Sequence, residues 1–146
     1  MNVRLANVDD LPELVALGAK FHQFSGELVP YCPASAEASA RALLQMGFAL
    51  IAEDADTPVG MIGVGIVPLF FNARVLVAQE LMWWVDEGKR GSGVALSLLH
   101  EAEEQARGRG ATRLQMVALA ASPPQVAHVY QRQGYRLSET AFSKEI

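Results

Sequence analysis

The sequence predicts a mixed α/β sheet, and three observations lead to this fold class. Several short segments alternate apolar and polar residues or are continuously apolar, as strands do. Other segments repeat apolar residues every three or four positions, as amphipathic helices do. Gly, Pro and Asp clusters separate the two kinds of segment. The expected order is strand, two helices, three strands, helix, strand, helix, strand.

The N-terminal part is expected to form one strand and two helices. Residues 3–5 alternate in the manner of a strand, and Asp10 followed by Glu13 resembles a capping box. The helix that follows carries one apolar stripe, formed by Leu11, Leu14, Val15, Gly18 and Phe21. Residues 22–33 mix aromatic and polar groups with Gly and Pro, which predicts an irregular segment. An Ala-rich helix is expected over 35–46.

The central part is expected to form an antiparallel hairpin and a long strand. Residues 48–53 and 59–67 are rich in strand-forming residues, and the turn-forming segment DADTP lies between them. A corner is expected over 68–74. Residues 75–85 are β-branched, aromatic or large and apolar, which indicates a long and largely buried strand.

The C-terminal part is expected to contain two helices and two strands. An apolar stripe at a spacing of four predicts a helix over 94–107, which the glycines of 108–110 end. Residues 114–119 are expected to form a strand. Pro123 and Pro124 open a short helix that ends at Gly134, and the chain from Tyr135 onward is expected to be extended.

Composition bounds the class of protein. The length of 146 residues predicts a single domain over 1–146, and 51% hydrophobic against 19% charged residues excludes disorder by composition. A net charge of −4 argues against a protein that mainly neutralises nucleic-acid phosphates. The single cysteine, Cys32, closes no intrachain disulfide, and no metal-ligand spacing is present.

The N-terminus has no pattern of a secretory signal, and 59–71 is too short and too interrupted to cross a bilayer. We therefore expect a cytoplasmic protein without a metal, nucleic-acid or membrane partner.

The most informative segment is 85–95, VDEGKRGSGVA, between the long strand and the next helix. A helix N-terminus offers unpaired amides, and glycines let a phosphate approach that backbone, while Lys89 and Arg90 add charge. The alternative is a simple turn whose glycines satisfy tight backbone angles. A P-loop would need a glycine at Trp83 and Ser or Thr at Arg90, and a dinucleotide fingerprint would need a small residue at Leu96. Neither motif is present.

Two motifs in the right order resemble those of the GCN5-related N-acetyltransferases (GNATs). Arg90-x-x-Gly93-x-Ala95 resembles the family's acetyl-CoA pyrophosphate loop, and 129–135, VYQRQGY, resembles its later Tyr and Gly-aromatic signature. The strand 80–85 is similar to that of small bacterial and phage-type members. The resemblance spans essentially the whole chain and implies a mostly antiparallel, twisted sheet flanked by helices, with splayed central parallel strands. Residues 122–124, Ser-Pro-Pro, depart from the family's common Asn, which puts one cofactor contact in doubt.

The resemblance also implies acetyl-CoA as cosubstrate, bound in the gap between the two splayed strands. The Val85 backbone would pair with the pantetheine, and the amides of 91–95 would hold the pyrophosphate. The implied cofactor-binding residues are Trp84, Val85, Arg90, Gly91, Ser92, Gly93, Val94 and Ala95.

Two residues are candidates for the acid and the base of acetyl transfer. An attacking amine must lose a proton and the departing thiolate must gain one. Tyr130 matches the family's proton donor, with a packing role as the alternative. Glu80 is the nearest base, although Gln79 or a water chain could serve instead. Strand alternation puts Glu80 on the face opposite Val85 unless a bulge intervenes.

The acceptor is expected to be a primary amine of a small molecule or a protein. This family builds its acceptor pocket in the irregular segment, which here contains His22, Phe24, Glu27 and Tyr31. Each of these four residues alone could equally be structural. The competing hypothesis is a non-catalytic acyl-CoA-binding or regulatory module of the same fold. A homodimer is possible.

Overall fold

The computed structural model describes residues 1–146 and contains one five-stranded sheet with strand order β1-β2-β3-β4-β5. Three neighbouring pairs are antiparallel, and the pair β4–β5 is parallel. The strands are β1 (Asn2–Leu5), β2 (Gly47–Asp54), β3 (Thr57–Leu69), β4 (Asn72–Val85) and β5 (Ala111–Gln115). The α-helices are α1 (Leu11–Ser25), α2 (Pro33–Met46), α3 (Val94–Gly108) and α4 (Gln125–Arg132), and short 3-10 turns form η1 (Val8–Asp10) and η2 (Glu87–Lys89). The expected mixed, mostly antiparallel sheet is confirmed.

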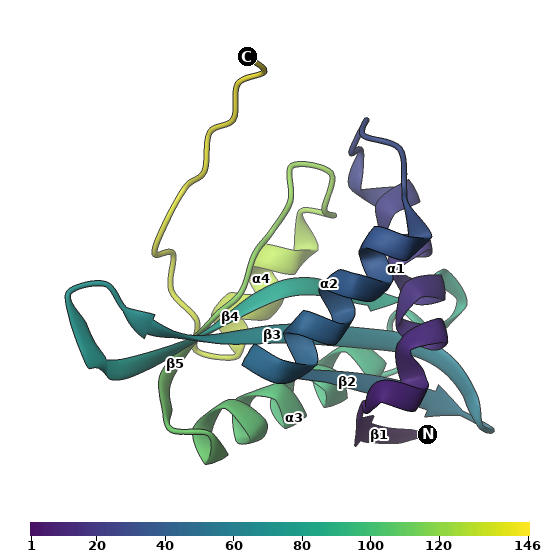
Figure 1. The fold of residues 1–146 in the computed structure, drawn as a ribbon, viewed down its shortest axis with the longest axis horizontal. Helices are drawn as coiled ribbons and strands as arrows, with labels where there is room; N and C mark the ends of the chain where they lie inside the picture. Colours follow the sequence, from purple (N-terminus) through teal and green to yellow (C-terminus); the bar gives the residue numbers. More distant parts are fainter.

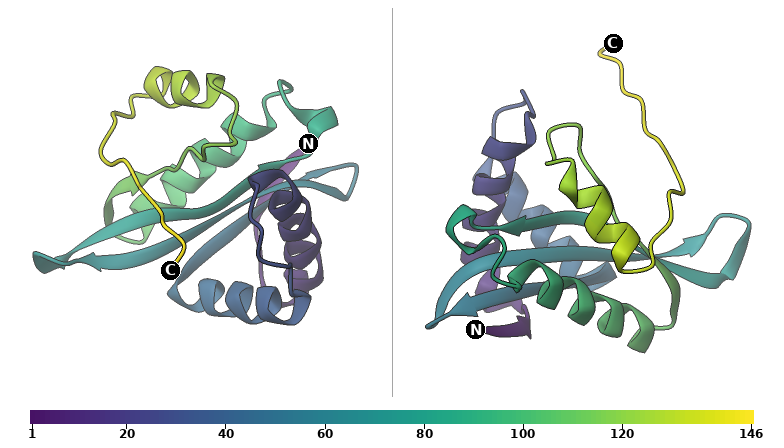
Figure 2. Two further views of the ribbon diagram at one scale, coloured as in Figure 1. Left: turned by 90° about the horizontal axis from the view of Figure 1, so that it is seen from above. Right: turned by 180° about the vertical axis from the view of Figure 1, so that it is seen from behind.

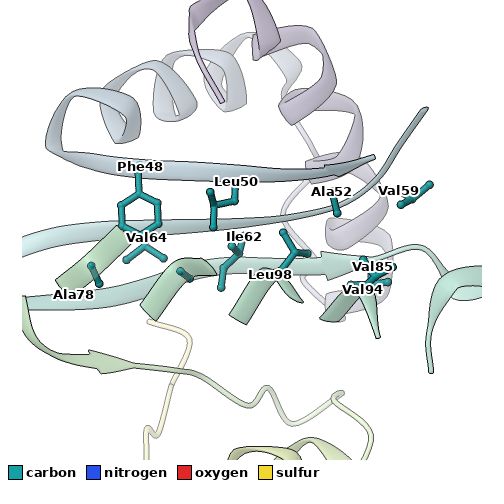
Figure 3. Close-up of a cluster of buried hydrophobic side chains, with 12 residues drawn as sticks. Phe48, Leu50, Ala52, Val59, Ile62, Val64, Ala78, Val85, Val94 and Leu98 are labelled. Atoms are coloured by element: carbon teal, nitrogen blue, oxygen red, sulfur yellow. The ribbon is translucent and has the colours of Figure 1, made fainter. Parts of the chain in front are cut away.

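Helices cover both faces of the sheet. Figure 2 shows α1 and α2 on one face and α3 and α4 on the other. Leu50 and Ile51 are adjacent in β2 and both fully buried, because Leu50 faces the α3 side and Ile51 the α1 and α2 side. The larger core cluster joins β2, β3 and β4 to α3, with Ile62 and Leu98 at its centre (Figure 3). No helix is both long and apolar enough to span a membrane.

A partly buried ion pair, in which only Asp10 is fully buried, fixes the start of the chain to the sheet. The Arg4 guanidinium lies 2.7 Å from a carboxylate oxygen of Asp10 and 2.7 Å from one of Glu53. Asp10 is buried, and its carboxylate also accepts the Asn7 amide, which caps η1. The Arg4 side chain holds the pKa of the Asp10 carboxyl below its ordinary value.

A bulge in β4 reverses the side-chain alternation of that strand. Gly63 lies opposite Met82 while the next residue, Val64, lies opposite Glu80, so Leu81 is the extra residue. Ala78 before the bulge and Val85 after it consequently belong to the same core cluster, on the α3 side. Glu80 therefore shares a face with Val85, which uninterrupted alternation would have prevented.

Three expectations about element boundaries were wrong. Helix α1 continues through residues 22–25, which were expected to be irregular. The expected corner over 68–74 is a tight hairpin, with Phe70 and Phe71 at a tip that projects beyond the body (Figure 1). Strand β5 ends at Gln115, and the chain after α4 contains no strand, so β5 forms the edge of the sheet.

Candidate active site

A gap opens where β4 and β5 separate. The two strands pair at Leu76, Ala78 and Gln79, and no pairing continues beyond Gln79. The C-terminal half of β4 therefore has β3 on one side and no strand on the other. The Asp86 amide donates to the Val59 carbonyl of β3 at 2.8 Å, so the Val85 carbonyl of the same peptide points away from β3. This gap is the expected place of the splayed strands.

Glu80 and Tyr130 meet at the peptide groups of one residue, Val117, at the closed end of the gap. The Val117 amide donates to Oε2 of Glu80 at 3.0 Å, and the Tyr130 hydroxyl donates to the Val117 carbonyl at 2.7 Å. These two side chains use the backbone groups that a longer β5 would have used for pairing. The sequence did not single out Val117, because no local pattern signals a backbone that bonds to distant side chains.

Burial gives the two side chains complementary protonation behaviour. Glu80 is only 6% exposed, and desolvation of its charge raises the pKa of the carboxyl to about 7, against the lowering effect of the Val117 amide. Burial, followed by the nearby charge of Glu80, raises the pKa of the Tyr130 hydroxyl well above its ordinary value. Near neutral pH, Glu80 can accept a proton, and Tyr130 holds one that it can donate.

Trp83 lies beside this pair. Its ring stacks on Tyr130 with the centroids 5.8 Å apart and the planes 27° apart. It packs against the α3-side core cluster, whereas its neighbour Trp84 belongs to the cluster under α1 and α2. The Trp83 indole N–H is closed to solvent and has no hydrogen-bond partner. Most buried donors in proteins are paired, so this one requires an explanation.

The loop before α3 has the backbone that an anion site needs. Gly91 and Gly93 have φ angles of 80° and 90°, a region that residues with a side chain rarely adopt. A Cβ at either position would meet nothing within 4 Å, so the loop is open on that side. Gly93 precedes the first turn of α3, whose leading amides, at 94–96, have no acceptor within the helix. The Ser92 amide, in contrast to the amides of 94–96, already has an acceptor. The Ser92 amide and hydroxyl both donate to the Lys89 carbonyl, at 3.3 Å and 2.6 Å.

The two cationic side chains of the loop contact protein groups. The Lys89 ammonium pairs with the carboxylate of Asp54, the last residue of β2. The Arg90 guanidinium lies 4.9 Å from the ring centre of Phe24 and 4.8 Å from that of Trp84, and its Nε donates to the Val85 carbonyl at 3.1 Å. The loop therefore presents backbone amides, while its charged side chains fix its position.

An ion pair ties the same loop to α1. The Lys20 ammonium lies 2.9 Å and 2.8 Å from the two carboxylate oxygens of Asp86, and the Trp84 indole donates to Asp86 at 2.8 Å. This contact could not be predicted from the sequence, because Lys20 and Asp86 are distant in the chain and their residue types are common on surfaces.

The four predicted acceptor residues all make contacts within the protein. The His22 Nε2–H donates to the Val29 carbonyl at 2.6 Å, and Glu27 accepts the Val29 amide at 2.9 Å. The Tyr31 hydroxyl donates to the Val15 carbonyl of α1 at 2.7 Å. These three side chains fix the segment between α1 and α2, and only Phe24 reaches the loop, through Arg90.

Two surface hollows lie away from the gap. A hollow of about 430 Å³ lies between the start of β1 and one face of α3, with Val3 and Ser97 among its lining residues. A second, of about 290 Å³, lies between the segment after β1 and the start of β2, near Ala6 and Phe48. Neither contains a predicted site residue, so the candidate site rests on the gap and the loop. Groups of His, Cys, Asp and Glu able to hold a metal ion are absent.

Comparison with known proteins identifies the family. The sequence matches the profile of the acetyltransferase (GNAT) family over residues 20–135, which includes both motifs and the gap between β4 and β5. The chain belongs to the GNAT family. Comparison with curated protein sequences finds no significant match.

Solved structures of other GNAT-fold proteins superpose over almost the whole chain. The ribosomal-protein-alanine N-acetyltransferase of Brucella melitensis biovar Abortus 2308 is 19% identical with a TM-score of 0.76, covering 100% of both chains. A predicted acetyltransferase of Clostridium acetobutylicum, solved with acetyl-CoA, is 17% identical with a TM-score of 0.80, covering 99% of this chain and 95% of that one. The aminoglycoside antibiotic 6'-N-acetyltransferase of Acinetobacter haemolyticus is 23% identical with a TM-score of 0.73, covering 100% and 99%. At these identities the likeness shows the fold.

Proposed function

We propose that this GNAT protein transfers an acetyl group from acetyl-CoA to a primary amine by direct attack of the amine on the thioester. One observation carries the proposal: Glu80 and Tyr130 are both hydrogen-bonded to Val117 at the end of the gap between β4 and β5. Attack by an amine requires a base, and departure of a thiolate requires a proton donor, so the two groups must lie close together.

Glu80 is the proposed base. An alkyl amine has a pKa of about 10.4 and is protonated at neutral pH, so a group must take its proton before attack. A carboxyl with a pKa of about 7 is well matched to this task, because it is ionised in part at neutral pH and still basic. Gln79, the neighbouring alternative, has no titratable group.

Tyr130 is the proposed acid. A thiol has a pKa of about 8.5, so the departing thiolate gains stability from a proton. The Tyr130 hydroxyl stays protonated at neutral pH, because burial raises its pKa. This hydroxyl donates to the Val117 carbonyl, so it must turn from that carbonyl to serve the sulfur.

The loop fits the pyrophosphate of the cosubstrate. The open side of Gly91 and Gly93 and the leading amides of α3 support binding of an anion by the backbone of 91–95, apart from the Ser92 amide, which donates to the Lys89 carbonyl. Arg90 and Trp84 act by holding the loop against α1. The Val85 carbonyl accepts from Arg90, and its position on the open edge of β4 supports contact with the pantetheine.

Calorimetric titration with acetyl-CoA, followed by a panel of primary amines with thiol release as readout, tests the proposal. Binding with turnover of at least one amine is the expected result. The acceptors to include first are aminoglycosides and the alanine of ribosomal proteins, because proteins of similar fold are named for activity on these acceptors. Binding without turnover of any amine contradicts catalysis of amine acetylation.

A non-catalytic acyl-CoA-binding module is the second candidate. The engagement of His22, Glu27 and Tyr31 in fixing their own segment favours it, because those side chains are not free to meet an acceptor. Saturable acetyl-CoA binding with no acetylated amine is its signature.

A homodimer in the cytoplasm completes the proposal. The chain after α4 runs away from the body (Figure 1) and exposes Leu137, Phe142 and Ile146, while β5 has a free edge. Exposed apolar side chains beside an open strand edge support association with a second copy. Light scattering of the full chain in solution tests this, and a monomeric mass contradicts it.

A further inference from the structure

The unpaired indole N–H of Trp83 is the starting observation. It is closed to solvent and has no partner, whereas the N–H of the neighbouring Trp84 donates to Asp86. Removing a donor from water without a new bond is unfavourable, so the Trp83 N–H is an unsatisfied buried group. A ligand that accepts a hydrogen bond there would gain from satisfying it.

The position of Trp83 in β4 indicates which part of a ligand could reach it. The proposed pyrophosphate loop begins after Val85, at the end of the strand, and the proposed acid and base lie at Glu80 and Tyr130. A molecule that joins these two points must run along residues 81–85 of β4, on the open side of that strand. Trp83 lies in the middle of that segment, on the same side as Glu80.

We infer that the Trp83 indole is a ligand-binding donor that recognises a carbonyl oxygen of the acyl-pantetheine arm of acetyl-CoA. This inference rests on the proposed function. The arm carries amide and thioester carbonyls, which are good acceptors for an indole N–H. With the pyrophosphate held at the loop after Val85, the adenosine and pyrophosphate parts would lie beyond the end of β4, away from Trp83.

Access to the indole requires one neighbour to move. Tyr130 stacks on the Trp83 ring, and its hydroxyl is held by a hydrogen bond to Val117. The proposed acid role already requires Tyr130 to leave that carbonyl. The same movement would uncover the face of the Trp83 ring that Tyr130 contacts.

Nuclear magnetic resonance of the full chain labelled with nitrogen-15 tests the inference directly. The sequence contains two tryptophans, so two indole N–H signals are expected. The Trp84 signal is the internal control, because its N–H is already bonded. The Trp83 signal should move downfield with acetyl-CoA, and should stay with 3'-phospho-ADP, which has the pyrophosphate but no pantetheine arm. Equal movement of the Trp83 signal with both ligands would overturn the inference.

The Trp83→Phe variant provides the second measurement. It removes the N–H and keeps an aromatic ring against Tyr130. Acetyl-CoA should bind about three- to tenfold more weakly, which corresponds to one neutral hydrogen bond, with 3'-phospho-ADP affinity unchanged. If the wild-type protein binds acetyl-CoA and the variant binds it equally well, the inference fails and the proposed function stands. If the wild-type protein does not bind acetyl-CoA, both fail.

Discussion

Replacing Glu80 by Gln should stabilise the protein at high pH while it lowers activity. Glu80 is buried, and its carboxyl titrates at a pKa of about 7 in the folded state against an ordinary value of 4.5. The folded state therefore binds its proton more tightly than the unfolded state does. The free energy of unfolding contributed by this group is highest below pH 4.5 and falls as pH rises to about 7.

The magnitude follows from the two pKa values. A difference of about 2.5 units at 1.36 kcal/mol per unit gives about 3 kcal/mol as the cost of ionising the buried carboxyl. Gln carries no charge and can still accept the Val117 amide. The stability of Glu80→Gln relative to the wild type should therefore increase by up to about 3 kcal/mol between pH 4.5 and about pH 8.

Urea unfolding of both proteins at the two pH values measures this difference. Glu139→Gln is the matched control, because Glu139 lies exposed after α4 and its replacement removes a charge without any burial. The control difference should not change with pH. In an activity assay, kcat/KM of the wild type should rise with pH, with its midpoint at about pH 7 and a plateau above that pH. Glu80→Gln should lose about 10²- to 10⁴-fold in kcat/KM. The reasoning would be refuted if the difference in free energy of unfolding between Glu80→Gln and the wild type did not change with pH.

Three further predictions concern the acid, the loop and the N-terminal ion pair. Tyr130→Phe should lower turnover about 10²- to 10⁴-fold with acetyl-CoA affinity nearly intact, and unchanged turnover in a thiol-release assay would contradict its role as acid. Gly93→Val should weaken acetyl-CoA binding in calorimetry, because a φ of 90° strains a β-branched residue and distorts the loop; undiminished affinity would argue against an anion site there. Arg4→Ala should lower the free energy of unfolding, measured with urea, by about 3 kcal/mol, because it leaves the buried Asp10 carboxylate without its cation. A loss below about 1 kcal/mol would show that this pair contributes no more than an exposed ion pair does.

The loop could be predicted from the sequence because its determinants are local. A positive φ at Gly91 and Gly93 and the start of α3 depend on residues next to one another. The alternation of side chains in β4 also follows from neighbouring residues. The bulge at Leu81 depends on the register with β3, and no residue of β4 predicts that register. The face of Glu80 was therefore open from the sequence and is settled by the register.

The acceptor residues show the limit of a family resemblance applied to single side chains. His22, Glu27 and Tyr31 were predicted from the family's acceptor segment, but His22 lies in α1, and their partners are the backbone of Val29 and Val15. Contacts between distant residues also explain why β5 ends earlier than the sequence predicts. Residues 116–119 have strand-like composition, yet side chains from β4 and α4 take the backbone groups of 117. Such contacts between distant residues are decided by the tertiary structure.

Calorimetric titration of the full chain with acetyl-CoA, with NADPH as the control ligand, tests the central claim most directly. The open loop over 91–95 and the gap beside β4 predict saturable binding of acetyl-CoA and none of NADPH. Absence of acetyl-CoA binding would contradict the account, and the glycines before α3 would then serve only to form a turn.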